Sequence, residues 1–333
     1  MARVAVMGAG TWGSAFSLVL ADAGNDVSLW ARRDAVCAVI NDLHENPDYL
    51  PDVRLPDTVR ASHDPADVLE GTEVVVLAVP AQMLRNNLAD WAPKIPDSAV
   101  MVSLMKGIEL GTLKRMSQVI TELTDALPER VAVITGPNLA REIAARQPAA
   151  SVVACTDEHT ATWLQSLCHT PAFRPYTNLD VVGCELGGAT KNVIALAVGM
   201  TEGLGFGDNA KASVITRGLA ETGRLAAAMG ADPMTLAGLA GLGDLVATCS
   251  SPLSRNRQFG VKLGQGHGVD EITASTRTVA EGVRSCESIY GLARERGVDM
   301  PIVEHVAAVV RGELDAEQLV VSLVSRSAKP ERH

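Results

Sequence analysis

Aromatic residues and positive charge are both scarce in this chain. Phe, Trp and Tyr make up 3% of its 333 residues, and 29 Lys and Arg stand against 39 Asp and Glu, for a net charge of −10. Nucleic acids and anionic membrane surfaces are bound by concentrated positive charge, and single strands also by stacked aromatic rings. The composition therefore predicts no nucleic-acid partner. The positive charge for any phosphorylated ligand must be gathered locally.

The chain also lacks the cysteine and histidine spacings of metal sites. Its six cysteines contain no Cys-x-x-Cys pair, and its seven histidines show no His-Glu-x-x-His pattern. Scattered cysteines of this kind are typical of reduced cytosolic thiols rather than of zinc sites or disulfide frameworks. We therefore expect no metal ion.

Targeting and membrane segments are a third absence. The first strand-like segment starts by Arg3 with no basic and apolar leader before it, and no uninterrupted apolar run approaches the length of a membrane span. We expect a cytoplasmic protein without an integral membrane segment. With 47% hydrophobic and 20% charged residues, the chain is long enough for two globular domains. The oligomeric state is not readable from the sequence, and a homodimer stays open.

The most informative feature present is a glycine motif close to the start. Gly8, Gly10 and Gly13 follow the apolar run Arg3–Met7 and precede an apolar helical stretch. In dinucleotide-binding proteins such glycines serve a tight turn, close approach of the backbone to a pyrophosphate, and close packing of helix on strand. A helix from about Thr11 would offer free N–H groups and its positive dipole end to the same anion. A dinucleotide site is predicted, the alternative being a glycine-rich turn in another α/β protein.

The end of the next predicted strand, Asp26–Trp30, bears on the choice of cofactor. NAD-binding proteins usually place an acidic residue there to hold the ribose 2′-hydroxyl. This chain continues instead with Arg32 and Arg33 and reaches a carboxylate only at Asp34. Guanidinium groups bind a 2′-phosphate through forked, charge-assisted hydrogen bonds. NADP(H) is favoured, while NAD(H) and a pair of solvated surface arginines stay as alternatives.

Further apolar runs predict a doubly wound parallel sheet in the first domain. They are continuous rather than alternating, as in strands covered by helices on both faces. They span 73–79, 99–104, 130–135 and 151–155, with helical segments at 82–91 and 113–127 among them. Ligands of such sheets bind beyond the carboxyl ends of the strands, so function is expected at 80–81, 105–107 and 136–138.

After about Asp180 the pattern changes to helices, at 181–200, 210–229, 235–239, 285–296 and 302–311. No Ser/Gly linker marks the change, which indicates tightly packed domains. The predicted fold class is α/β, with an N-terminal Rossmann-type doubly wound parallel sheet and an all-α C-terminal domain. The predicted domains are residues 1–180, which bind NAD(P), and residues 181–333, which form the helical substrate and catalytic domain.

Lys191 is the side chain that most strongly indicates chemistry. On a helix it shares a face with Gly187, Ala195 and Val198. This small, apolar stripe would partly bury the ammonium and leave room for a ligand. Burial lowers a lysine pKa toward the range useful in acid–base catalysis. Alternatively, the stem covers apolar surface while the ammonium reaches solvent.

Three other segments carry polar groups suited to a substrate. Lys106 follows a strand at the cofactor edge, where it either polarises a carbonyl or is an ordinary loop lysine. Asp244 lies in an apolar, glycine-bearing stretch, where it either orients a cation or, considered alone, more simply caps the following helix. Residues 254–257 (Ser-Arg-Asn-Arg), expected in a loop, together suit a phosphate, although such short basic clusters are commonly solvated.

Taken together, these segments resemble NAD(P)-dependent glycerol-3-phosphate dehydrogenases of the bacterial type. The resemblance rests on GAGTWGSAF, SLMKGIE, GPNLAREIA, GGATKNVIALAVG, GLGDLVATC, SRNRQFG and VAEGV, which occur in this order from Gly8 to Val283. The glycine motif is shared with many oxidoreductases, whereas GATKN, GLGDLVATC and SRNR together are far more specific. The resemblance implies reversible reduction of dihydroxyacetone phosphate to sn-glycerol 3-phosphate, a precursor of glycerophospholipids.

The resemblance also implies roles for individual residues. It assigns to the cofactor Gly8, Gly10, Thr11, Trp12, Gly13, Arg32, Arg33, Lys106, Ala140, Arg255, Val279 and Glu281. It assigns to the substrate Lys106, Gly136, Asn138, Lys191, Asp244, Ser254, Arg255 and Asn256. Lys191 would be the proton acceptor, with Lys106 and Asp244 as its catalytic partners. The family more often has a hydroxyl residue where this chain has Asn138, so a backbone contact is expected there and a side-chain contact stays open.

Two other functions stay open. A dehydrogenase of β-hydroxy acids or sugar acids would also join a Rossmann domain to a helical domain bearing a lysine, but its carboxylate substrate would not require residues 254–257. A non-catalytic NADPH sensor would keep the glycine motif without needing Lys106, Lys191 and Asp244 together. Phosphate dependence separates the first alternative from the resemblance, and NADPH oxidation separates the second.

Overall fold

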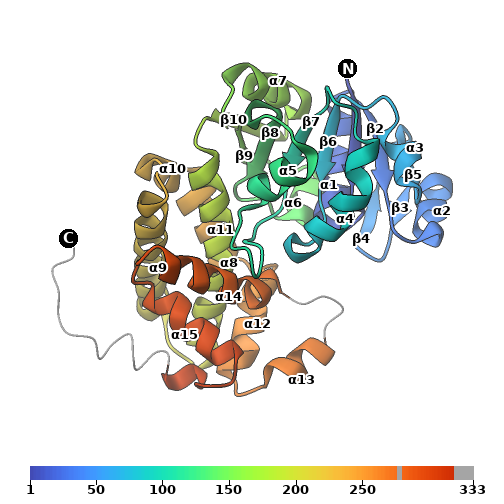
Figure 1. Cartoon of the computed structure of the whole chain (residues 1–333). Coiled ribbons are helices and arrows are strands. Elements are labelled where there is room, and N and C mark those ends of the chain that lie inside the picture. Colours follow the sequence, from blue (N-terminus) through green and yellow to red (C-terminus); the bar gives the residue numbers. More distant parts are fainter. Residues whose placement is uncertain (276–279, 319–333) are drawn as a thin grey trace.

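The computed structural model describes residues 1–275 and 280–318, in which a sheet-based domain is followed by helices (Figure 1). Eight strands form one sheet in the order β10-β9-β8-β7-β6-β1-β2-β5. They are β1 (Arg3–Met7), β2 (Asp26–Trp30), β5 (Val59–Ser62), β6 (Val74–Leu77), β7 (Val100–Ser103), β8 (Val131–Thr135), β9 (Ala149–Ala154) and β10 (Phe173–Asn178). Two short strands, β3 (Glu45–Asn46) and β4 (Leu50–Arg54), form a separate antiparallel hairpin.

Helices cover both faces of the sheet, as the continuous apolar strands predict. They are α1 (Thr11–Asp22), α2 (Asp34–Leu43), α3 (Pro65–Leu69), α4 (Leu84–Trp91), α5 (Met116–Thr124), α6 (Ala140–Ala144) and α7 (Glu158–Cys168). Alternate residues of β1 belong to opposite cores. Val6 packs in the cluster that contains Phe16 of α1, whereas Met7 packs with Leu84 of α4. The predicted fold class is confirmed.

One detail of the predicted sheet is wrong, because β9 runs antiparallel to β8. A parallel crossover needs a helix that runs back along the strand. The helix between them, α6, has five residues, a length of about 7.5 Å, whereas a five-residue strand such as β8 is about 17 Å long. The chain therefore turns back beside β8. The neighbouring pair β9–β10 is again parallel.

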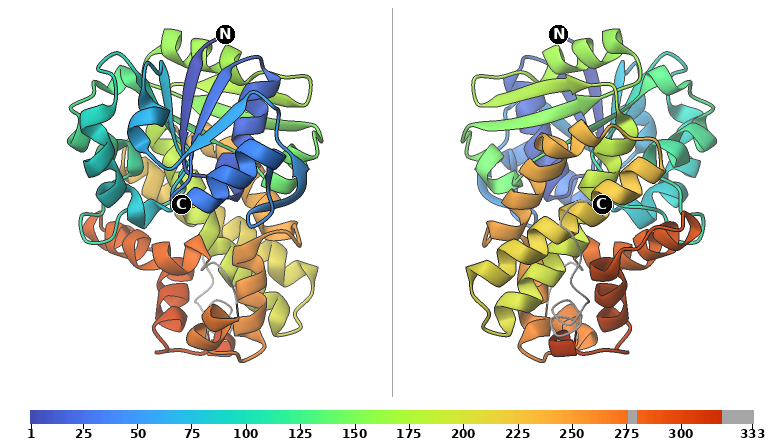
Figure 2. Two further views of the ribbon diagram at one scale, coloured as in Figure 1. Left: turned by 90° about the vertical axis from the view of Figure 1, so that its right-hand side faces the viewer. Right: turned by 90° about the vertical axis from the view of Figure 1, so that its left-hand side faces the viewer.

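The second part of the chain is helical, and the change from strands to helices falls between Asn178 and Val181. It contains α8 (Val181–Gly203), α9 (Asp208–Ala228), α10 (Pro233–Ala237), a π-helical turn η4 (Leu239–Gly243), α11 (Asp244–Ser250), α12 (Arg255–Gly264), α13 (Val269–Ala274), α14 (Glu281–Glu295) and α15 (Pro301–Val310). Helices α9, α11, α12, α14 and α15 pack around α8, and Figure 2 shows this group of helices beneath the sheet domain.

Helix α8 is the long apolar helix of the second part, although Glu185, Lys191 and Asn192 interrupt its apolar residues. Among the described residues it is the one helix long and apolar enough to cross a membrane, by length and composition alone, and 94% of its apolar window is buried inside the protein. Its partner α12 packs against it backbone to backbone. A Cβ on Gly199 would lie 2.2 Å from the Arg257 carbonyl oxygen, and one on Gly260 would lie 2.2 Å from that of Leu196. This crossing fixes the start of α12 beside the middle of α8.

Candidate active site

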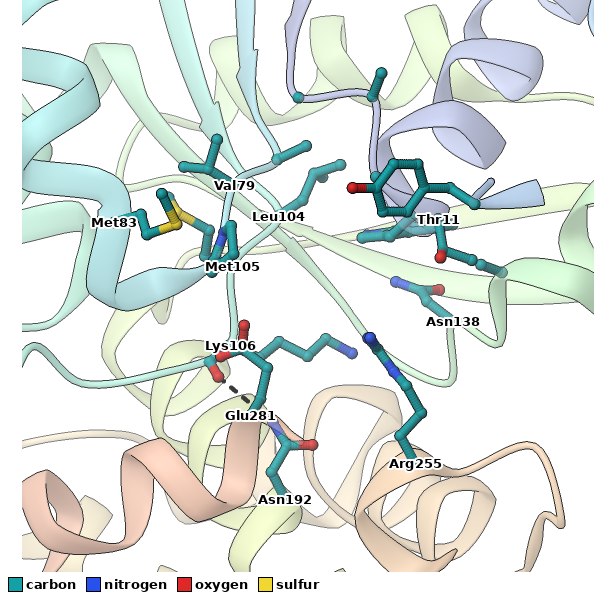
Figure 3. Close-up of a pocket in the computed structure, with 18 of the residues that line it drawn as sticks. Thr11, Val79, Met83, Leu104, Met105, Lys106, Asn138, Asn192, Arg255 and Glu281 are labelled. Atoms are coloured by element: carbon teal, nitrogen blue, oxygen red, sulfur yellow. Dashed lines mark hydrogen bonds between the residues drawn. The ribbon is translucent and has the colours of Figure 1, made fainter. Parts of the chain in front are cut away.

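A cleft of about 1000 Å³ separates the carboxyl edge of the sheet from the helical part of the chain (Figure 3). Its walls come from the glycine turn, from the segments that follow β2, β6, β7 and β8, and from the first turns of α12 and α14. The strand ends expected to carry function contribute Pro80, Lys106 and Asn138 to this lining. The topology thus brings together segments that are far apart in the sequence.

The glycine turn has the shape that a dinucleotide requires. Gly8 has φ +140°, and a Cβ there would lie 2.6 Å from the Ala78 carbonyl oxygen, while a Cβ on Gly13 would lie 1.9 Å from that of Gly8. Nothing lies within 4 Å of the Cβ position of Gly10, which caps α1 without a side-chain hydrogen bond. Gly8 and Gly13 serve close packing, and Gly10 leaves open space beside free helical N–H groups, where a pyrophosphate fits.

Arg32 and Arg33 line one end of the cleft, next to Tyr49. Both arginines are exposed, as a site for a charged group on a bound ligand requires. Arg33 forms an ion pair with Asp48, with 2.5 Å between Nη2 and Oδ2. Thr11 and Trp12, from the first turn of α1, and Ala140, from the start of α6, line the cleft as well.

Three residues predicted to be catalytic meet beside the cleft, where Lys106 and Lys191 belong to the lining and Asp244 lies buried behind them. Asp244, 1% exposed, accepts a hydrogen bond from Lys191 Nζ at 2.6 Å and one from Lys106 Nζ at 2.5 Å, each on a different carboxylate oxygen. Lys191 Nζ also donates to Thr248 Oγ1 at 2.6 Å, and Lys106 Nζ to the Gly136 carbonyl at 3.0 Å. Each ammonium thus uses two of its three hydrogens within the protein and keeps one for the cleft that both lysines line.

This arrangement decides two alternatives that the sequence left open. The Lys191 side chain is only 10% exposed, so it does not extend along the surface to solvent. Asp244 is the first residue of α11, and the residue that caps this helix is Gly243, without a side-chain bond. The helix-capping role for Asp244 is therefore wrong, and its carboxylate orients two cations instead.

Burial of Lys106 lowers its pKa to about 8, because desolvation disfavours the ammonium. The carboxylate of Asp244 opposes this effect, whereas the positive charge of Lys191 reinforces it. Without the carboxylate between them, two lysines in one buried cluster would repel each other. Asp244 therefore keeps both amines close together and favours the charged form of Lys106.

A chain of side-chain amides links this cluster to the helices opposite. Asn192, next to Lys191 on α8, donates to the Lys106 carbonyl at 3.4 Å and accepts from Asn256 Nδ2 at 2.9 Å. The amide oxygen of Asn256, Oδ1, accepts a hydrogen bond from the Gly282 N–H at 2.9 Å. Asn256 is 8% exposed. Its side chain thus connects the start of α12 with the start of α14.

The expectation of a loop at residues 254–257 is wrong. Ser254 caps α12, and its Oγ accepts from the Arg257 N–H at 3.3 Å, so Arg255 and Asn256 lie in the first turn of a helix. Arg257 points away and pairs with Glu202 at 2.7 Å. Ser254, Arg255 and Asn256 all line the cleft. In Figure 3, Arg255 extends toward the cavity from the helical side, opposite Asn138.

Three predicted site residues remain: Asn138, Glu281 and Val279. Asn138 lines the cleft and donates to Ser151 Oγ at 3.2 Å, while its buried Oδ1 has no hydrogen-bond partner in the described part of the chain. Glu281 begins α14 and lines the cleft, and burial raises the pKa of its carboxyl against the lowering effects of Arg255 and Arg284. Val279 lies outside the described residues.

Several lining residues were not singled out from the sequence. Thr248 follows Asp244 by four residues, the spacing that puts both on one face of α11, and this signal could have found it. Asn192 follows Lys191 directly. Tyr49 and Arg284 also line the cleft, and no sequence pattern points to them. Among the described residues there is no group of three or more His, Cys, Asp or Glu side chains that could hold a metal ion.

Comparisons with known proteins agree over nearly the whole chain. A model of the NAD-dependent glycerol-3-phosphate dehydrogenase N-terminus matches residues 3–161, and one of its C-terminus matches residues 180–321. A curated glycerol-3-phosphate dehydrogenase (NAD(P)+) from Streptomyces coelicolor is 61% identical over 330 residues, which are 99% of this chain and 98% of the relative. The chain belongs to the NAD-dependent glycerol-3-phosphate dehydrogenase family.

More distant members of this family, an oxidoreductase family, support the assignment. The glycerol-3-phosphate dehydrogenase (NAD(P)+) of Corynebacterium glutamicum is 55% identical over 332 residues, which are 99% of this chain and all of the relative. The crystal structure of glycerol-3-phosphate dehydrogenase from Coxiella burnetii has a TM-score of 0.93 at 36% identity and covers 98% of this chain and 99% of that one. A D-mandelate dehydrogenase has a TM-score of 0.63 at 14% identity over 95% of this chain and 99% of that one, and this likeness shows the fold alone.

Proposed function

We propose that the chain catalyses the reversible NAD(P)H-dependent reduction of dihydroxyacetone phosphate to sn-glycerol 3-phosphate, which supplies the precursor of glycerophospholipids. The observation that carries this proposal is the Lys106–Asp244–Lys191 cluster, whose two ammonium groups line the same cleft as the glycine turn and the start of α12. A sensor of NADPH would have no use for paired buried lysines. Arg255 at the N-terminal turn of α12, beside Ser254 and Asn256, offers the donors that a phosphate can use.

The residues present fit a nicotinamide dinucleotide. Its pyrophosphate would lie against Gly10, Thr11 and Trp12, and Arg32 and Arg33 would hold the adenosine ribose, with NADP(H) preferred and NAD(H) accepted. Ala140 and Glu281 also line the cleft. When bound, the nicotinamide would supply the hydride that adds to the C2 carbonyl carbon of the substrate.

The lysines would provide the positive charge and the proton. In reduction, negative charge develops on the C2 oxygen, and the Lys191 ammonium would donate its remaining hydrogen to it. In the reverse direction the free amine of Lys191 would accept that proton. Lys106 would stabilise the same oxygen, because a positioned cation in a desolvated site lowers the barrier. Asp244 would hold both amines in place, so that Lys191 can donate the proton while Lys106 stabilises the same oxygen.

The substrate phosphate would bind at the first turn of α12. Arg255 would contribute its guanidinium, and the backbone N–H groups of Arg255 and Asn256 would contribute the helix terminus. The Asn256 amide already bonds to Asn192 and Gly282, so we assign its contact to the backbone. Ser254 and Asn138 would complete the pocket, and the unpartnered Asn138 Oδ1 can accept a bond from the substrate hydroxyl.

Oxidation of NADPH and NADH, followed at 340 nm, tests the proposal with three substrates: dihydroxyacetone phosphate, unphosphorylated dihydroxyacetone and a β-keto acid. We expect fast oxidation only with the phosphorylated ketone. Fast turnover of the β-keto acid would favour a hydroxy-acid dehydrogenase. Tight NADPH binding without oxidation of any substrate would favour a sensor.

The domain limits and the cellular setting belong to the same proposal. Residues 1–180 would bind the cofactor, and residues 181–333 would supply the proton and hold the phosphate. We place the enzyme in the cytoplasm, and a homodimer stays open as its oligomeric state. Light scattering of the purified chain measures its mass in solution, and a monomer at micromolar concentration would exclude the dimer.

A further inference from the structure

The hairpin β3–β4 is fixed against the glycine turn. Asn46, 1% exposed, donates its two amide hydrogens to the Ala9 carbonyl and to Ser14 Oγ, both at 2.9 Å. Leu50, at the other end of the short connection, is also 1% exposed. The residues between them, which include Asp48 and Tyr49, are therefore held in a defined place beside the proposed cofactor site.

Asp48 uses this position to contact an arginine of the cleft. Its carboxylate lies 2.5 Å from Arg33 Nη2, and the two side chains are 46% and 51% exposed. Arg33 lines the cleft, whereas Asp48 is not among the described lining residues. The hydrogen bond that Arg33 donates to Asp48 raises the pKa of the guanidinium. Within residues 1–275 and 280–318, Arg32 forms no ion pair, so the two neighbouring arginines differ in the charge that they present.

The consequence differs between the two forms of the cofactor. A 2′-phosphate carries up to two negative charges and, when bound by Arg33, would lie within several ångströms of the Asp48 carboxylate, which repels it. A ribose 2′-hydroxyl is neutral and meets no such repulsion. We propose that Asp48 is a specificity-determining residue that lowers the preference of this site for NADP(H) over NAD(H) by partly neutralising Arg33. This inference rests on the proposed dinucleotide site.

The expected effect is moderate, because both side chains are half exposed and water screens the charges between them. Asp48→Asn should raise the affinity ratio of NADPH to NADH by roughly threefold to tenfold in low salt. The gain should shrink as ionic strength rises and the Debye length falls. Asp48→Glu, which keeps the charge, should leave the ratio near that of the unchanged protein.

The experiment measures the dissociation constants of NADPH and NADH in the absence of substrate, from nicotinamide fluorescence, at low and high salt. The matched control is Asp57→Asn, which removes an equally negative side chain that is 73% exposed, pairs with Arg54 at 2.9 Å and does not line the cleft among the described residues. We expect a raised ratio for Asp48→Asn and an unchanged ratio for Asp57→Asn.

Three results would overturn the inference. An unchanged ratio would mean that Asp48 does not influence the 2′ group, and a lowered ratio would mean that it orients Arg33 for the phosphate. An equal rise in the Asp57→Asn control would indicate a general effect of net charge. Failure of the unchanged protein to bind either dinucleotide would overturn the proposed function itself. That result is distinct from the other three, all of which require measurable binding.

Discussion

Replacing Asp244 with asparagine tests the centre of the proposed mechanism. The substitution keeps the shape of the side chain but removes the charge that lies 2.6 Å from Lys191 Nζ and 2.5 Å from Lys106 Nζ. The lowering of the Lys106 pKa from 10.5 to about 8 already corresponds to a cost of roughly 3 kcal/mol for keeping this ammonium charged. Asp244 opposes that cost. Without it, the pKa of Lys106 should fall below 8, and the lysine should lose its proton near neutral pH.

Breaking a buried ion pair by removing one partner costs about 3–5 kcal/mol. If most of this free energy is lost from the transition state, kcat for dihydroxyacetone phosphate reduction should fall at least about a hundredfold at pH 7. The alkaline limb of the pH–rate profile should also move to lower pH. Steady-state rates from pH 6 to 10 measure both effects, with Asp208→Asn, a 96% exposed carboxylate, as the control. A kcat within threefold of the unchanged enzyme, with the same pH profile, would refute the reasoning.

Three further predictions follow from the same contacts. Lys191→Ala should leave NADPH affinity nearly unchanged and lower kcat by about 10²–10⁴-fold, and retention of half the kcat would contradict its role as proton donor. Arg255→Ala should lower kcat/KM for dihydroxyacetone phosphate by roughly tenfold to a hundredfold with little effect on dihydroxyacetone, and Arg255→Lys should restore only part; equal losses on both ketones would indicate a cofactor or structural role. Glu221, 3% exposed, accepts a hydrogen bond from the Ile302 N–H at 2.9 Å, and burial raises its pKa from 4.5 to about 7. Between these two pH values the folded protein holds a proton that the unfolded chain releases, so the free energy of unfolding falls as pH rises from 4.5 to 7. As pH rises from 4.5 to 8, the free energy of unfolding of Glu221→Gln, measured with urea, should therefore increase by up to roughly 3 kcal/mol relative to that of the unchanged protein. If the two proteins differ by the same amount at both pH values, Glu221 does not titrate in this range.

The parts of the fold that could be predicted from the sequence are those governed by local patterns. The glycine turn and β1 follow from residues adjacent in the chain, and the burial of Lys191 follows from the small residues one turn away on the same helix face. Helix α12 could not be predicted this way. It contains Gly260 and Gly264, and glycine costs a helix about 1 kcal/mol per residue. The helix forms because those glycines allow close packing on α8, which is a tertiary effect.

The site was only partly predictable for the same reason. The sequence identifies Lys106, Lys191 and Asp244 as separate candidates, and for Asp244 local reasoning favours the wrong role. The hydrogen bonds that show the actual role of Asp244 come from Lys106 and Lys191, which lie 138 and 53 positions away in the chain. Nothing in a single sequence states that two lysines share one carboxylate. The family resemblance supplied the grouping, and the distances then supply the physical reason for it.

The division of the site between the two parts of the chain has a consequence for how the enzyme is built. Lys106 and the Gly136 carbonyl come from the sheet domain, whereas Lys191, Asp244 and Thr248 come from the helices. The Lys106–Asp244 bond therefore crosses between the two parts of the chain and helps to set the distance between the amines of Lys106 and Lys191. The amide chain through Asn192 and Asn256 crosses at a second point and ends on the backbone of α14. Any tilt of the helices against the sheet would change both links together, so the geometry at the proposed reacting carbon depends on domain packing as much as on the lysines themselves.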